Sequence, residues 1–112
     1  MTTITDDMMR ERISQTKSYA VLIIKKTEKF GGPDTEKIVW EHGRRNFQLR
    51  AEGLLSIVCP INDGSEVAGI GIFNTTSEET TNIYADDPGV KAGIFTFEVH
   101  PCRAFPGDSL PR

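Results

Sequence analysis

Hydrophobic and polar positions along the chain predict four strands. Residues 19–24 are apolar at odd and even positions alike, which is typical of a strand covered on both faces. Residues 54–59 and 67–74 flank a turn sequence that contains Asn, Asp and Gly, and they are expected to form a hairpin. Apolar and polar residues alternate over residues 93–100, which predicts a fourth strand with one apolar face.

Two helices are predicted between these strands. The first helix is predicted over residues 33–52. It begins at the proline of a Gly-Gly-Pro breaker, and a glycine follows its last residue, as is common for helices. Thr76 and Glu79 have the spacing of a capping box, so a shorter helix is expected over residues 77–85. Residues 1–16 show no sustained period and are expected to be a mobile arm or a short irregular helix.

The order of these elements predicts an α+β fold of the ferredoxin-like βαββαβ type over residues 17–101, with an extended tail over residues 102–112. Right-handed crossovers would place both helices on one face of a four-stranded antiparallel sheet, with the first and third strands central. The other face keeps apolar side chains that no remaining residues can cover. We therefore expect two copies to form a dimeric α+β barrel, sheet against sheet, enclosing the chamber in which an imidazole acts.

Composition and charge narrow the range of partners. The chain has 13 basic and 16 acidic residues and a formal net charge of −3, which argues against nucleic acids and anionic membranes. It contains neither an apolar run of the ~20 residues that span a bilayer nor the apolar region of a signal peptide. Cys59 and Cys102 fit a reducing compartment, so the cytoplasm is the expected location. These two cysteines are expected on opposite edges of the sheet, too far apart for an internal disulfide.

His42 is the first candidate for chemistry. The residues expected along one inward face of the first predicted helix are Ile38, His42, Arg45 and Leu49. An imidazole there is suited to moving protons near neutral pH, but it is equally compatible with a buried histidine that is hydrogen-bonded for structural reasons. Arg45 either binds a carboxylate or phenolate of a ligand, or packs its stem and extends its head to solvent.

Asp87 is the second candidate. An aspartate directly before Pro88 is a good helix N-cap, which by itself would explain the residue. Its carboxylate would also be able to reach the imidazole of His42 and fix the tautomer, as the third member of a catalytic triad does. The two roles are compatible because a carboxylate has two oxygens. Asp86 is expected to be the solvated neighbour.

The last predicted strand carries three polar side chains on its second face, namely Thr96, Glu98 and His100. They would supply polar groups to a ligand cavity if that face lines one, or else they face water. His42, His100 and the two cysteines lack the short spacing of zinc ligands, and no phosphate-binding glycine motif is present. Neither a metal nor a cofactor is therefore expected.

Three stretches of the chain carry a family resemblance over roughly residues 19–101. They are Glu41-His42 with Leu49 and Gly53-Leu54-Leu55, then Asp87-Pro88 with Val90 and Ala92-Gly93, and finally the strand ending in His100-Pro101. Together they resemble the YciI-like (YCII-related) family of small dimeric α+β barrel proteins. The resemblance implies a ferredoxin-like fold, dimers, and His42 and Asp87 as an acid–base pair. The chain differs from the family in having Cys59-Pro60 where Gly-Pro is usual, and in its longer tail.

The leading hypothesis is a homodimeric, cofactor-independent protein that binds a small organic molecule between helix and sheet. His42 would shuttle a proton and Asp87 would orient it, which suits isomerisation or elimination. The competing hypothesis is a non-catalytic binding or interaction module. In that case the two residues only lock the first helix to the Asp-Pro turn.

Overall fold

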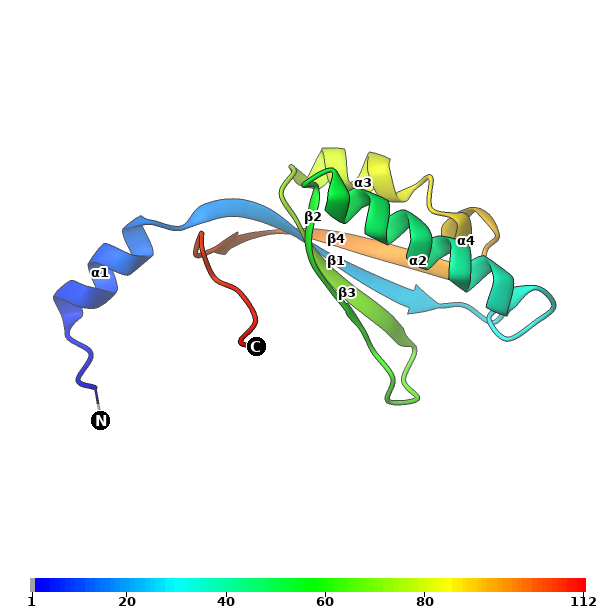
Figure 1. The fold of residues 1–112 in the computed structure, drawn as a ribbon, viewed down its shortest axis with the longest axis horizontal. Coiled ribbons are helices and arrows are strands. Elements are labelled where there is room, and N and C mark those ends of the chain that lie inside the picture. Colours follow the sequence, from blue (N-terminus) through cyan, green and yellow to red (C-terminus); the bar gives the residue numbers. More distant parts are fainter. Residues whose placement is uncertain (1) are drawn as a thin grey trace.

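The computed structural model describes residues 2–112, which form one sheet with helices on one side of it (Figure 1). The elements along the chain are α1 (Asp6–Ser14), β1 (Lys17–Lys26), α2 (Thr35–Ala51), β2 (Leu55–Pro60), β3 (Val67–Phe73), α3 (Ser77–Tyr84), α4 (Pro88–Lys91) and β4 (Phe95–Ala104). All strand pairs are antiparallel, in the order β2-β3-β1-β4. The ferredoxin-like α+β fold is therefore confirmed, with β1 and β3 central.

Local sequence signals account for the helix ends. At the start of α3, the Thr76 hydroxyl accepts from the backbone N–H of Glu79, and the Thr76 N–H donates to the Glu79 carboxylate. The bond from that N–H holds the pKa of Glu79 below its usual value. α2 ends just before Gly53, whose φ of 78° is the left-handed conformation that glycine adopts easily. The capping box and the terminating glycine are both confirmed.

The last strand is longer than the sequence indicates. β1 and β4 pair along their whole lengths, from Lys17 opposite Ala104 to Lys26 opposite Phe95. The prediction that the strand ends near Pro101 and that a separate tail begins at residue 102 is therefore wrong. β4 is an edge strand, and such strands tolerate proline because only one of their sides pairs with a neighbour.

The N-terminal arm contains a regular helix rather than an irregular one. The Thr5 hydroxyl accepts from the N–H of Met8 and caps α1. Figure 1 shows α1 standing away from the sheet, at the end of the long ribbon that β1 and β4 form. None of the residues in α1 is buried. The arm therefore leaves the second face of the sheet uncovered.

The two faces of the sheet differ in what covers them. The core lies between the sheet and the helices and consists of Ala20, Leu22, Ile24, Leu49, Leu55, Phe73, Tyr84, Ile94 and Phe95. The side chains of alternate strand residues point away from this core. The aliphatic members of that second set are Val21, Ile23, Ile57, Ile70 and Ile72, and we call the surface they form the open face. Ile70 retains 37% of its exposure in the single chain.

Cys59 lies on β2 and Cys102 on β4, the two opposite edge strands, and both are free thiols, as predicted. Among residues 2–112, no helix combines the length and the apolar character needed to cross a membrane.

Gly89, in α4, provides a test of packing on the covered face. A Cβ at this position would overlap the ring of Phe95, so Gly89→Ala is expected to lower the free energy of unfolding by about 1–3 kcal/mol. Gly43, within α2, is the matched control because a Cβ there meets nothing within 4 Å. Gly43→Ala is expected to raise the free energy of unfolding by up to about 1 kcal/mol. Urea denaturation of both variants checks this, and equal stabilities would contradict it.

Candidate functional site

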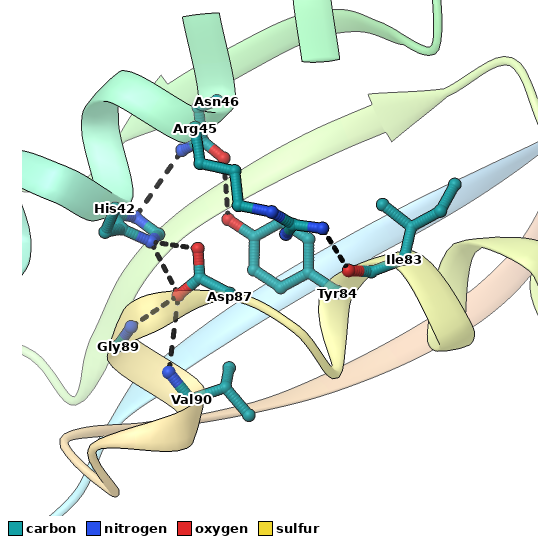
Figure 2. A network of polar contacts seen from close by, with 8 residues as sticks. All are labelled: His42, Arg45, Asn46, Ile83, Tyr84, Asp87, Gly89 and Val90. Atoms are coloured by element: carbon teal, nitrogen blue, oxygen red, sulfur yellow. Dashed lines mark hydrogen bonds and ion pairs between the residues drawn. The ribbon is translucent and has the colours of Figure 1, made fainter. Parts of the chain in front are cut away.

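His42 and Asp87 are in direct contact. Nδ1 of His42, on α2, lies 2.8 Å from Oδ1 and 2.9 Å from Oδ2 of Asp87, which precedes α4 (Figure 2). The Asp87 side chain is fully buried, whereas that of His42 keeps 12% of its exposure. The structure thus brings together the two residues that the sequence singled out.

The backbone of its own turn also holds the Asp87 carboxylate. Oδ2 accepts hydrogen bonds from the N–H groups of Gly89, at 2.9 Å, and Val90, at 3.3 Å. Pro88 occupies the first position of α4, where a helix needs no N–H donor. A buried carboxylate requires such donors, because an unpartnered charge in the interior is costly. Asp87 therefore caps α4 and contacts His42 at once, while Asp86 is exposed.

Asn46 and Tyr84, which the sequence did not single out, extend this network. The Tyr84 hydroxyl donates to Oδ1 of Asn46 at 2.9 Å, and both residues are buried. Burial raises the pKa of the Tyr84 phenol, and the negative charge of Asp87 raises this pKa further. The phenol therefore stays protonated throughout the neutral pH range and acts as a donor.

The donor role of Tyr84 determines the direction of the remaining bonds. Because Oδ1 of Asn46 accepts from Tyr84, the amide nitrogen Nδ2 faces Nε2 of His42, at 3.5 Å. An amide N–H only donates, so Nε2 carries the lone pair and Nδ1 carries the proton that His42 donates to Asp87. The network thus places the hydrogen-bonded proton of His42 on Nδ1 and makes Nε2 the acceptor of the long contact from Asn46.

His42 and Asn46 line a hollow of about 490 Å³ between α2 and the sheet. This volume lies within the range of small-molecule sites. A wider hollow of about 790 Å³ lies beside Trp40 and Phe47 of α2, but its lining includes neither His42 nor Asp87. We therefore place the candidate site in the smaller hollow, which we call the cavity. Its apolar lining side chains are Ile24, Phe30, Val39, Phe47, Val58, Pro60, Ala68 and Phe95.

Arg45 does not line this cavity. Its Nη2 donates to the backbone carbonyl of Ile83, at 2.7 Å, and so ties α2 to α3. The structure therefore does not bring Arg45 to a ligand beside His42. Arg50, eight residues beyond His42 on α2, lines the cavity instead. The spacing of four that links His42, Asn46 and Arg50 is visible in the sequence, but it does not show which side of the helix meets the cavity.

Thr96, Glu98 and His100 lie on the open face, on the other side of the sheet from His42. They are paired with Lys25, Ile23 and Val21, respectively, and paired residues point to the same face. The Glu98 carboxylate lies 3.7 Å from Nζ of Lys25 and 3.6 Å from Nε2 of His100. The structure therefore does not bring these three residues together with His42 and Asp87. The sequence led us to expect that a second copy, packed on the sheet, would enclose the imidazole of His42. This expectation is wrong, because His42 lies on the helix side of the sheet and the uncovered surface is the other side.

Within residues 2–112, no three His, Cys, Asp or Glu side chains are arranged to hold a metal ion.

Comparison with known proteins finds distant likenesses among solved structures. No protein-family model matches the chain. No curated protein matches it either. Among solved structures, the chain is similar to 5-chloro-2-hydroxyhydroquinone dehydrochlorinase from Burkholderia phenoliruptrix AC1100, in complex with 2,5-dihydroxybenzoquinone. The identity is 16%, the alignment covers 72% of this chain and 90% of that chain, and the TM-score is 0.48.

Tyr84→Phe tests the direction of the network. The variant leaves Oδ1 of Asn46 buried without a donor, so we expect the free energy of unfolding to fall by about 1–3 kcal/mol. The ¹⁵N signals of His42 are expected to show that the proton is no longer confined to Nδ1. Tyr19→Phe is the control, because the Tyr19 hydroxyl makes no hydrogen bond within residues 2–112. Unchanged stability and ¹⁵N signals in Tyr84→Phe would contradict the assignment.

Proposed function

We propose that the protein is a YciI-like homodimeric enzyme that catalyses proton transfer in a small organic molecule bound in the cavity. The reaction would be an isomerisation or an elimination. The observation that carries the proposal is the contact between Nδ1 of His42 and the buried Asp87 carboxylate, which leaves Nε2 available as a base beside a largely apolar cavity. A positioned base in a largely apolar hollow is the main requirement of such chemistry.

In the proposed reaction, Nε2 of His42 removes a proton from a carbon next to an electron-withdrawing group. The resulting imidazolium is stabilised by the Asp87 carboxylate, which holds the ring in place. The proton then returns to another atom of the substrate in an isomerisation, or goes to the leaving group in an elimination. The contact from Asn46 to Nε2, at 3.5 Å, is long and therefore weak, so a substrate can displace it.

The competing function is a non-catalytic binding or interaction module. The observation in its favour is that Asp87 is fully buried and caps α4, which explains the carboxylate without chemistry. In that case the contact with His42 serves to join α2 to α4.

Deuterium exchange separates the two functions without knowledge of the substrate. The protein is incubated in D₂O with cyclic enones, unsaturated lactones and β-keto acids, and mass spectrometry follows the label. The wild type is expected to accelerate exchange in at least one compound. His42→Gln is expected to reduce that rate by about 100-fold or more. His100→Gln, which replaces the histidine of the open face, is the control and should exchange like the wild type. If the wild type accelerates no exchange and His42→Gln loses only stability, the non-catalytic function is correct.

The proposed homodimer is supported by the open face. Its aliphatic side chains lie together on the sheet, and no helix of residues 2–112 covers them. Exposed apolar surfaces of this kind are typical of interfaces, and two sheets can pack face to face through such side chains.

Sedimentation at micromolar concentration tests the dimer. The wild type is expected to sediment at twice the chain mass of 12.4 kDa. Ile70→Lys is expected to sediment as a monomer, because the interface would then bury an unpaired charge. Trp40→Lys, at a position on α2 that is 71% exposed, is the control and should remain dimeric. A monomeric wild type, or a dimeric Ile70→Lys, would contradict the assembly.

A further inference from the structure

Three polar side chains of α2 form a row along the cavity. His42, Asn46 and Arg50 are four residues apart and all line it. Residues at this spacing lie one above the other on a helix, and the Cα atoms of His42 and Arg50 are separated by two turns, or about 12 Å. Asn46 is buried and His42 is nearly so, whereas Arg50 is exposed. The row therefore runs from the interior of the protein to its solvent-exposed surface at Arg50.

Arg50 is a cation without a partner of its own. Of the neighbouring arginines of α2, Arg44 pairs with the Glu41 carboxylate. Arg45 donates from Nη2 to the Ile83 carbonyl, while its Nη1 is buried without a partner among the described residues, outside the cavity. The side chain of Arg50 forms neither an ion pair nor a hydrogen bond within residues 2–112. A guanidinium keeps its charge at every accessible pH and offers a planar fork of donors.

The charge of Arg50 is not balanced within the cavity. The residues that line it include no aspartate and no glutamate among those the structure describes, although the chain as a whole carries a net charge of −3. The remaining wall is largely apolar and includes the rings of Phe30, Phe47 and Phe95. The cavity therefore combines a surface suited to a flat apolar body with one positive charge at its opening.

We infer that the ligand of this cavity is a ring-containing monocarboxylate, bound with its carboxylate in the fork of Arg50 and its ring against the phenylalanine side chains. This inference rests on the proposed function, because it takes the cavity to be the place where His42 acts. Arginine binds carboxylates through two parallel hydrogen bonds, which fixes orientation as well as position. A carboxylate held two helical turns from Nε2 serves to bind and orient the ligand and is not the reacting group. Its binding energy would place a distant carbon of the ligand at His42.

Binding of paired probes tests the inference. Benzoate, phenylacetate and 2-naphthoate are each compared with the matching neutral amide, by NMR titration at low ionic strength. The wild type is expected to bind at least one carboxylate about tenfold or more tightly than its amide, and added salt should reduce the difference. Arg50→Gln is expected to abolish this preference, and Arg50→Lys to retain part of it, because lysine keeps the charge without the fork. Arg44→Gln removes a charge from the same helix, outside the cavity, and should bind like the wild type.

The outcomes for carboxylate binding and for catalysis are distinguishable. Binding of the probes is compared between the wild type and the Arg50 variants and requires no proton transfer, whereas deuterium exchange depends on His42. If the wild type does not prefer the carboxylates, or if Arg50→Gln leaves the preference intact, the inference is overturned, even where deuterium exchange still depends on His42. If the preference depends on Arg50 but no compound shows exchange, the carboxylate site stands and the catalytic proposal fails.

Discussion

A fully buried carboxylate must be surrounded by hydrogen-bond donors, and the site depends on how Asp87 meets that requirement. Two donors come from the turn that Asp87 itself caps, through the N–H groups of Gly89 and Val90. The third comes from His42, 45 residues away on α2. The bond between them joins two elements that no local signal connects, and it sets the position of the imidazole relative to the cavity. Gly89 is part of the same arrangement, because its lack of a side chain leaves room for the ring of Phe95.

The demand for stability alone does not account for this network. A buried ionic or polar cluster is often no more stabilising than apolar side chains of similar volume, because each polar group must first lose its water. Here the core contains Asp87, Asn46 and the hydroxyl of Tyr84, and their bonds fix the orientation of the His42 ring. Nδ1 is held by Asp87, whereas Nε2 has only the long contact from Asn46. An arrangement of this kind suits the general base of the proposed function.

Secondary structure and sheet order could be predicted from the sequence because they follow from local signals and from the handedness of crossovers. The capping box at Thr76 and the apolar strand β1 are examples. The end of β4 could not be predicted, since tolerance of Pro101 depends on the strand being at an edge, which is a property of the whole sheet. The contact between His42 and Asp87 was anticipated only with the help of a family resemblance. From the sequence alone, capping explained Asp87 equally well.

The surroundings of His42 show a subtler limit of sequence reasoning. The inward face of a helix is broad, and residues three and four positions along both fall on it. On α2, Arg45 lies on the side of this face that contacts α3. Asn46 and Arg50 lie on the side that lines the cavity. Periodicity gives the face but not its division, because the division depends on which element packs on which side. A polar residue at the boundary of such a face can be assigned only when the neighbouring elements are placed.

Strand alternation places the open face and the cavity on opposite sides of the sheet. Successive residues of β2 illustrate this: Ile57 points to the open face, and Val58 lines the cavity. A second copy packed on the open face would therefore not block the cavity. A ligand in the cavity would likewise not contact the surface between the two copies. Since the sheet is only one layer thick, a shift of one strand on ligand binding would also displace side chains of the open face. Any coupling between binding and assembly would therefore pass through the strands themselves, and β2 carries residues of both surfaces next to each other in the chain.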